Sequence, residues 1–509
     1  MNLIKSTGTF SFFTIISRLL GYLRDILIAV FLGAGFLADA FFVAFRIPNT
    51  FRRLFSEGTF NAAFVPSYSS ELTKGKVKAN NFANEVFNLL LLSLLALVLI
   101  AQVFMPIFVS MIAPGFIDDN EKISLAIDLT RITFPFLLLV SLASFFSAIL
   151  NTRNRFAEAA AAPIILNVVL ILILIFGRSL GDKLIYYLSG GVTLAGLLQL
   201  IFLYFFVRRY LKLKVNFRLK IKSKVKIFFK KLLPSVFSSG VTQINILVGT
   251  IIASFQASAV SYLYYADRIY QINLAIAGIA IGVVILPQLS KYISKKNKKK
   301  VDLIQNKALE LSLFLSIPAS IALMIASEEI ISALFGYGQF NQSSVLNTAN
   351  ALYFFSLGLP AFAMIKVFSN FFFANHNTKT PFYVSLLSVL LNILISLYFF
   401  KTIGFIIIPI ATTISSWFNS PLLYFILKKK KLFSFNNIFI KRFFKILFAS
   451  IIMGLFFNYL MLFFQEELSF NHSFKSVYLI LTVILGLSFY LIISYLIKAF
   501  QLKDIKLKY

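Results

Sequence analysis

The chain has 509 residues, of which 59% are hydrophobic and only 13% charged. A soluble fold of this length cannot bury that much apolar surface, so a water-soluble enzyme is excluded. The 49 Lys and Arg against 19 Asp and Glu give a formal charge of +30. That charge indicates nucleic acid as a partner in a soluble protein, but cytoplasmic loops in a membrane protein.

Apolar runs separated by polar residues, Gly or Pro predict about fourteen membrane-spanning helices. Arg18 and Arg24 interrupt the first run, which therefore is expected to be a span and not a cleavable signal. In chain order the runs lie near residues 9–32, 36–57, 82–112, 125–150, 160–177, 184–207, 232–255, 260–287, 307–327, 345–373, 381–400, 404–427, 441–464 and 475–498.

The charges between these runs alternate in sign along the chain. If the N-terminus is cytoplasmic, the inner connections are basic: Lys74, Lys76, Lys78, Arg153, Arg155 and the stretches 208–231, 291–300, 428–431 and 503–508. The outer connections hold Asp118, Asp119, Glu121, Asp182, Glu328, Glu329, Glu466 and Glu467. Because positively charged loops stay in the cytoplasm, both termini are predicted to lie there. The basic residues are expected to set this topology and to contact membrane lipids. Nucleic acid is therefore not expected as a partner.

The sequence also repeats itself at an offset of about 224 residues. Pro114-Gly115 corresponds to Tyr337-Gly338, and Asn151 to Asn375. We therefore predict an all-α polytopic membrane protein with two six-helix lobes related by an axis along the membrane normal, followed by two C-terminal helices. The expected domains are an N-terminal lobe at 1–210, a basic amphipathic cytoplasmic linker at 211–231, a C-terminal lobe at 232–430, and the extra helices with a basic tail at 431–509. Such lobes are typical of transporters, although a repeat kept only for folding is the alternative.

Charged residues lie inside the predicted spans, where each one costs about 2.5 to 3.5 kcal/mol. Helix one carries Arg18, Arg24 and Asp25, and helix two carries Asp39, Arg46, Asn49, Arg52, Arg53 and Glu57. Pro48 removes a helix hydrogen bond and is expected to break the helical period of helix two. In the second lobe the corresponding charges are Asp267, Arg268 and Lys366.

Two interpretations of these charges are open. They can pair internally, Arg18 with Asp25 or Arg53 with Glu57, and only hold helices together. Basic residues outnumber acidic ones, however, and surplus positive charge in a cavity indicates an anionic ligand. Arginine suits bidentate contact with phosphate and keeps its proton at low dielectric, so a phosphate-bearing substrate is the hypothesis.

The motifs in these spans have a recognisable order. They are Ser17-Arg18-Leu19-Leu20-Gly21, Arg24-Asp25, Gly33-Ala34-Gly35, Ala38-Asp39-Ala40-Phe41-Phe42, Arg46-Ile47-Pro48-Asn49, Arg52-Arg53-Leu54-Phe55-Ser56-Glu57-Gly58, Tyr264-Tyr265-Ala266-Asp267-Arg268 and Tyr337-Gly338-Gln339-Phe340. From about residue 1 to 430 the sequence closely resembles the MurJ (MviN) family of lipid II flippases.

The resemblance implies the multidrug/oligosaccharidyl-lipid/polysaccharide exporter fold and, by alternating access, transport of undecaprenyl-diphosphate-linked GlcNAc-MurNAc-pentapeptide from the inner to the outer leaflet of the cytoplasmic (inner) membrane for peptidoglycan synthesis. Arg18, Arg24, Arg52 and Arg268 match the family's cavity arginines, and Asp39 and Asn49 its polar cavity positions. The extra helices resemble the family's groove for the polyprenyl tail. Gln271 and Asn273-Leu274-Ala275 stand where many relatives have an acid and then Pro-x-Gly, which removes a coupling role for that acid and the basis for a kink there.

On this basis Arg18, Arg24, Arg52 and Arg268 are expected to bind the diphosphate of lipid II, helped by Asp39 and Asn49. Arg46, Arg53 and Lys366 supply supporting charge, and Asp25, Asp39 and Glu57 limit repulsion in the empty cavity. Gly21, Gly33, Gly35 and Pro48 are expected to act as hinges, with close helix packing as the alternative.

No metal, cofactor or catalytic group is expected, because the chain lacks Cys, its two His residues are far apart and no nucleophile/base pair stands out. The membrane potential is the expected energy source, and the coupling ion stays open. Alternative functions are export of another polyprenyl-linked saccharide or of drugs, or a non-transporting scaffold for cell-wall enzymes. Cell-wall synthesis proteins are a partner class that the sequence leaves open.

Overall fold

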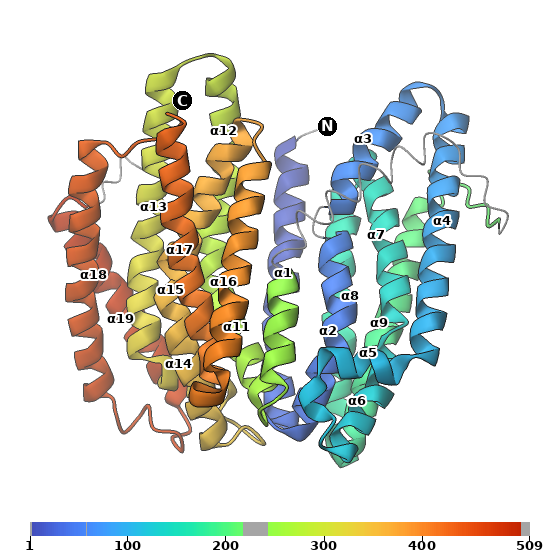
Figure 1. The fold of residues 1–509 in the computed structure, drawn as a ribbon, viewed down its shortest axis with the longest axis horizontal. Coiled ribbons are helices and arrows are strands. Elements are labelled where there is room, and N and C mark those ends of the chain that lie inside the picture. Colours follow the sequence, from blue (N-terminus) through green and yellow to red (C-terminus); the bar gives the residue numbers. More distant parts are fainter. Residues whose placement is uncertain (1–2, 57–58, 217–242, 500–509) are drawn as a thin grey trace. The chain divides into compact units, whose positions relative to one another are not determined.

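The computed structural model describes residues 3–56, 59–216 and 243–499, and regular structure in these ranges is helical (Figure 1). The chain divides into two compact units, Met1–Ser261 and Tyr262–Tyr509. Residues 243–261 thus group with the first unit, although the sequence predicts a second lobe from residue 232. The predicted linker at 211–231 lies largely outside the described residues, and the predicted domain limits stay predictions.

The first unit is a bundle in which α1 packs on α8, and α7 and α8 both pack on α9. Its helices are α1 (Leu3–Leu32), α2 (Phe36–Ser56), α3 (Thr59–Thr73), α4 (Lys76–Val103), α5 (Met105–Ile112), α6 (Asn120–Thr133), α7 (Phe136–Thr152), α8 (Phe156–Phe176) and α9 (Leu184–Val207), with short 3₁₀ turns at Pro114–Phe116 and Arg178–Lys183. A helical segment, Gln243–Ala253, and the first residues of α11 (Ala259–Leu274) complete it.

The second unit is built around α15, which packs on both α13 and α17. After α11 it contains a π-helical turn at Ala275–Ala280, then α12 (Ile281–Ser294), α13 (Lys298–Ile325), α14 (Ser327–Phe335), α15 (Gln342–Ala374), α16 (Lys379–Ile403), a 3₁₀ turn at Gly404–Ile406, α17 (Ile407–Lys429), α18 (Asn437–Phe463) and α19 (Lys475–Leu496).

Side chains of Asn and Asp begin several of these helices. Asp119, Asn297, Asn341 and Asn436 each accept a hydrogen bond from the backbone N–H three residues later, at the N-termini of α6, α13, α15 and α18. Such caps satisfy an N–H group that has no partner within the helix. The polar connections therefore fix where the long apolar helices start.

The helices are apolar and long enough for a membrane. Within the described ranges, nine helical stretches meet length and hydropathy criteria for a span. The stretch Lys475–Leu496 is only 22% buried at a mean hydropathy of 2.4, as expected for a helix surrounded by lipid. The predicted all-α membrane fold is confirmed, and the count of fourteen spans stays a prediction.

The internal repeat is visible in hydrogen bonds. Asn84 of α4 donates to the carbonyl of Lys212 (3.0 Å), and Asn306 of α13 donates to that of Ser434 (3.2 Å). Asn84 also accepts a hydrogen bond from the backbone N–H of Lys214, and Asn306 accepts one from that of Asn436. The clamps join the segment after the last helix of each repeat to α4 in the first unit and to α13 in the second. Each residue of the second clamp lies 222 positions after its counterpart in the first.

The helix ends refine the repeat register. Arg153 is the C-cap of α7 and is followed by Asn154 with a φ of 59°, and Asn375 is the C-cap of α15 and is followed by His376 with a φ of 58°. Asn375 therefore corresponds to Arg153, and the correspondence with Asn151 predicted from the sequence is wrong by two residues. The residue types of the two loops diverged, so local similarity misplaced the register.

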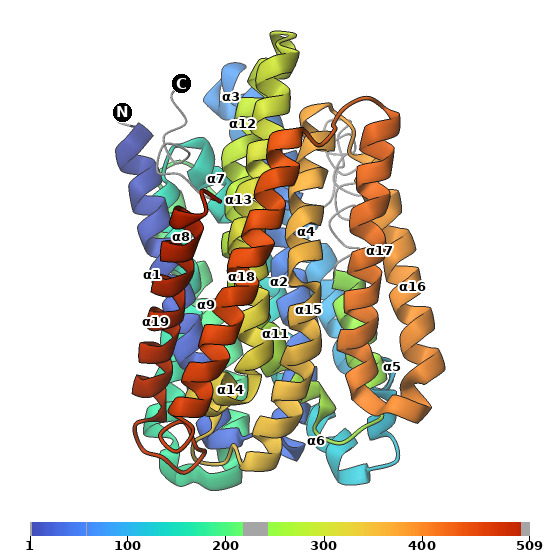
Figure 2. The same ribbon diagram turned by 90° about the vertical axis from the view of Figure 1, so that its left-hand side faces the viewer.

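The last two helices are anchored to the second unit (Figure 2). Arg442 of α18 pairs with Glu310 of α13 at 2.7 Å. Lys475, at the start of α19, donates to the carbonyls of Gly336 (2.8 Å) and Phe470 (2.7 Å). Buried polar contacts of this kind are costly to break, so α18 and α19 belong to this unit's folded core.

Candidate functional site

Arg24 is a buried cation in the middle of α1, with 4% of its surface exposed. Its Nε and Nη2 donate to Oδ1 of Asp25 at 3.0 and 2.7 Å, and its Nη1 donates to Oδ1 of Asn167 on α8 at 3.0 Å. The Asn167 amide in turn donates to the carbonyl of Ser17 at 2.8 Å. The packing of α1 on α8 therefore fixes the guanidinium in one orientation, and sequence reasoning missed Asn167.

Arg18, nearly two turns earlier on α1, is exposed. The sequence left open an internal pair of Arg18 with Asp25, but the Asp25 carboxylate pairs with its chain neighbour Arg24 instead. Within an apolar helix an exposed arginine is costly unless it faces water or an anion. The Arg18 side chain is thus accessible, whereas the Arg24 guanidinium is bound by Asp25 and Asn167.

The second helix adds further positive charge to the first unit. Arg52 donates from Nε to Oδ1 of Asn49 at 3.0 Å, a contact between residues on one face of α2. Arg46 and Arg53 are half-buried. Glu57, the predicted partner of Arg53, lies outside the described residues.

Asp39, at the start of α2, is fully buried. Its carboxylate pairs with Lys122 of α6 at 2.8 Å and accepts backbone N–H bonds from Ser258 and Ser261, each at 2.9 Å, and the Ser261 hydroxyl. The Lys122 ammonium also lies over the Phe116 ring, 4.3 Å from its centroid. The carboxylate is occupied by protein donors, which favours a structural role; its predicted contact with substrate stays a prediction.

Lys122 is a residue that sequence reasoning missed. It follows the acidic residues of a predicted outer connection, and 83 positions separate it from its partner Asp39, so the sequence did not indicate the pair. A buried lysine needs a carboxylate or other acceptors, so the signal lay in the fold and not in the local sequence.

The proposed hinge positions differ in what the backbone requires. Gly33 has a φ of 65°, where a side chain is strained, and it ends α1. At Gly21 a Cβ atom would meet only ordinary contacts with Asn167, and at Gly35 it would meet nothing within 4 Å. Helix α2 continues through Pro48. Close packing therefore explains neither Gly21 nor Gly35, and bending at these positions stays a prediction.

In the second unit Arg268 lies against a tyrosine. Its Nη2 donates to the hydroxyl of Tyr264 at 3.1 Å, and the guanidinium carbon lies 5.2 Å from that ring's centroid. One turn later, the Gln271 amide donates to the Asp267 carboxylate. Gln271 therefore occupies the place of the family's acid with a neutral hydrogen-bond donor.

At the end of Asn273-Leu274-Ala275, the segment that replaces the family's Pro-x-Gly, a π-helical turn begins and runs over Ala275–Ala280. A π-helical turn widens a helix locally and is common at functional sites. Lys366 of α15 is half-buried and its Cγ would lie 3.3 Å from a Cβ atom at Gly278. The small residue thus leaves room for the lysine stem beside the widened turn.

Within the described part of the first unit, α1 and α2 carry five arginines and only two carboxylates, of which Asp39 already has Lys122 as its partner. The first unit consequently holds surplus positive charge in helices of membrane length. Surplus positive charge of this kind suits a multiply charged anion, and arginine favours the oxygens of a phosphate or diphosphate.

Comparison with known proteins agrees with this chemistry. The family model "Lipid II flippase MurJ" matches residues 28–479. The chain belongs to this family. The MurJ resemblance found in the sequence is therefore confirmed, and the match continues beyond residue 430 through α18 and into the first residues of α19.

Individual relatives cover most of the chain. A protein of Rhizobium meliloti (strain 1021) is 40% identical over 83% of this chain and 80% of its own length, and one of Rickettsia prowazekii (strain Madrid E) is 37% identical over 83% of both. Both are described as "Probable lipid II flippase MurJ".

Solved structures give the same result for the fold. The structure "Lipid II flippase MurJ, inward closed conformation" matches with a TM-score of 0.82 at 29% identity, over 96% of this chain and 98% of that one. An inward-facing multidrug transporter of the MATE family matches with a TM-score of 0.64 at 16% identity, over 81% of this chain and 94% of that one, which shows a shared fold only.

Proposed function

We propose that this chain is a lipid II flippase, which carries undecaprenyl-diphosphate-linked GlcNAc-MurNAc-pentapeptide from the inner to the outer leaflet for peptidoglycan synthesis. Membership of the MurJ family supports the substrate. The observation that carries the mechanism is the surplus of arginines on α1 and α2, with Arg24 held by Asp25 and Asn167. A diphosphate is the part of the substrate that this charge would recognise.

The proposed roles of the arginines follow from their surroundings. Arg18 is exposed and would contact the diphosphate directly, whereas Arg24 is fixed and would present a guanidinium without further ordering of its side chain. Arg52, with Asn49, is proposed as a further ligand from α2, and Arg268 as a ligand from the second unit. Arg46, Arg53 and Lys366 would add long-range attraction.

The membrane potential is the proposed energy source. With the cell interior negative, each charge that crosses the full field gains about 2.3 kcal/mol per 100 mV. A positively charged empty site is drawn back toward the cytoplasm, which resets the transporter. Lipid II flipping should therefore be faster in polarised than in depolarised vesicles; equal rates would exclude this mechanism.

We also propose that the protein lies in the cytoplasmic membrane with both termini inside. The basic connections around Lys76 and Lys298 and the acidic ones around Asp118 and Glu328 support this orientation. Because the chain has no cysteine, a single Cys at Lys76 or at Asp118 would be the one reactive thiol. A membrane-impermeant maleimide should label intact cells at position 118 and not at 76, and the reverse pattern would overturn the topology.

The function is tested by depleting the protein and locating lipid II. Accumulation of lipid II in the inner leaflet supports a flippase. Accumulation of another polyprenyl-linked saccharide would support the alternative cargo, and unchanged leaflet distribution with mislocalised cell-wall enzymes would support a scaffold. We propose that the protein transports its substrate and does not catalyse a reaction. The arginines and their described partners can bind an anion, but they include no nucleophile.

A further inference from the structure

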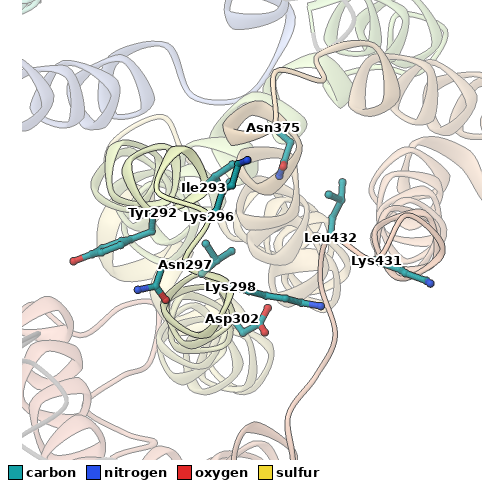
Figure 3. Close-up of a pocket in the computed structure, with 10 residues that line it drawn as sticks. Tyr292, Ile293, Lys296, Asn297, Lys298, Asp302, Asn375, Lys431 and Leu432 are labelled. Carbon is teal, nitrogen blue, oxygen red and sulfur yellow. The ribbon is translucent and has the colours of Figure 1, made fainter.

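The second unit contains a pocket among the turns that connect its helices (Figure 3). It has a volume of about 250 Å³. Three turns form it: the one between α12 and α13, the end of α15, and the one after α17. The residues that line it are Tyr292, Ile293, Lys296, Asn297, Lys298, Val301, Asp302, Asn375, Lys431 and Leu432.

The pocket is predominantly basic. Lys296, Lys298 and Lys431 come from two different turns and are all exposed, while Asp302 is its one acidic lining residue. Each ammonium is a compact charge with three hydrogen-bond donors. The amides of Asn297 and Asn375 add neutral polar groups. This composition suits a small anion.

The backbone of two of these lysines is unusual. Lys296 has a φ of 53° and Lys431 a φ of 54°, in the left-handed region where glycine is favoured. His376, next to Asn375, has a φ of 58°. Of the six non-glycine residues with positive φ in the described ranges, three thus lie on or beside this pocket. Lysine at strained turns favours a role for its side chain, because glycine would end these helices at lower cost.

The internal repeat shows why the pocket is open. At the offset of 222 residues, Asn375 and Leu432 correspond to Arg153 and Tyr210 of the first unit. There the Arg153 guanidinium lies over the Tyr210 ring, with its carbon 5.5 Å from the centroid. In the second unit both side chains are replaced by shorter ones, asparagine and leucine, and both replacements line the pocket.

We infer that this pocket binds a phosphate group. Phosphate is small, multiply charged and rich in acceptor oxygens, and lysine binds it as a point charge. It is presented either by the headgroup of an anionic phospholipid or by free phosphate. The lipid source requires the proposed topology, because only that orientation places the basic turns at the cytoplasmic leaflet.

Binding to the purified full-length protein tests the inference with two probes. Native mass spectrometry counts bound phosphatidylglycerol against phosphatidylcholine, and equilibrium dialysis measures radiolabelled inorganic phosphate. Preferential retention of phosphatidylglycerol assigns the headgroup as the source. Binding of inorganic phosphate with equal retention of both lipids assigns free phosphate.

Two variants separate the pocket from general charge. N375R/L432Y gives the pocket the residues of the first unit, so it fills the space while adding a positive charge. K296Q/K298Q/K431Q removes the three lysines. Both should weaken binding at least about tenfold: N375R/L432Y because the larger side chains occupy the pocket, and K296Q/K298Q/K431Q because each lost lysine removes about 1 kcal/mol of attraction to an anionic group.

The matched control is K76Q/K212Q/K214Q, which removes three exposed lysines around the corresponding clamp of the first unit. Its binding should stay within about twofold of the parent protein. Size-exclusion profiles and thermal unfolding confirm that each variant is folded. Stronger binding by N375R/L432Y, equal losses in both triple variants, or binding of neither probe by the parent protein would overturn the inference.

Discussion

At the residue scale, the sequence identifies the charged side chains inside the spans but not their partners. Asp25 and Arg24 are chain neighbours, yet the amide that completes their arrangement comes from Asn167, 143 positions later. Asp39 is paired with Lys122, which the sequence places among outer acidic residues. Pairing depends on which helices pack together, and a single sequence without that packing cannot reveal it.

Loss of the Lys122 ammonium should strongly destabilise the first unit. In K122A the buried Asp39 carboxylate keeps its serine donors but loses its cation, which costs about 3 to 5 kcal/mol for a buried pair. Thermal unfolding of the purified protein measures this loss, and D39N/K122A should recover part of it. K74A is the control, because the Lys74–Glu71 pair leaves the lysine 47% exposed and should cost under about 1 kcal/mol. Equal stability of K122A and the parent would contradict the structural role.

Glu329 of α14 should make stability depend on pH. Burial raises the pKa of its carboxyl, and the negative charge of Glu328 adds to the rise, while a backbone hydrogen bond opposes it. The folded state therefore holds this proton to higher pH than the unfolded state, so stability falls as pH rises from the ordinary value of 4.5 through the raised pKa. E329Q should flatten that decline in unfolding curves taken across this range. E328Q, which lowers the pKa only through the weaker charge effect, should flatten it less; identical curves for E329Q and the parent would refute the assignment.

At the element scale, hydropathy predicts the long helices well because apolar length is what a bilayer requires. Helix details were less predictable. The altered helical period predicted at Pro48 stays a prediction, since α2 continues through that residue, and the π-helical turn at Ala275–Ala280 follows no proline. The repeat offset was two residues too long at Asn375. Such details depend on tertiary contacts, for example the bond from the Ser312 hydroxyl to the Ala277 carbonyl in the π-helical turn, and residue type alone does not reveal these contacts.

The anchor of α19 should be sensitive to one lysine. Lys475 donates to two carbonyls and its ammonium lies 4.4 Å from the Tyr337 ring centroid and 4.5 Å from that of Phe470. K475M keeps the stem but loses the charge-assisted bonds, at a cost of about 1.5 to 3 kcal/mol. Hydrogen exchange in residues 464–475 should accelerate by about tenfold or more, and K401M, at an exposed lysine, should leave it unchanged. Unchanged exchange in K475M would show that apolar packing alone holds the helix.

At the scale of the whole molecule, the composition and the order of the motifs were sufficient to predict the fold class and the family. The charge of +30 divides into two populations. Most of it lies in connections, where it is proposed to set orientation and, at the pocket around Lys296 and Lys431, to bind phosphate. The remainder lies on helices. Lys122 and Lys475 form structural contacts there, and the basic residues of α1, α2, α11 and α15 are those to which the proposed transport mechanism is assigned. The sequence could not predict that the Asp39 carboxylate is paired with Lys122 whereas the Arg18 side chain is exposed.

The most direct test of the central claim is lipid II flipping by purified protein in vesicles, compared between R18A and R209A. Both variants remove one exposed arginine of the first unit, but Arg209 lies in the connection after α9. R18A should lower the initial rate at least about a hundredfold while inserting normally, since it removes a charge-assisted contact with the diphosphate worth about 3 kcal/mol, and R209A should transport at nearly the parent rate. Parent-like flipping by R18A would contradict the proposal that the arginines of the spans bind the substrate.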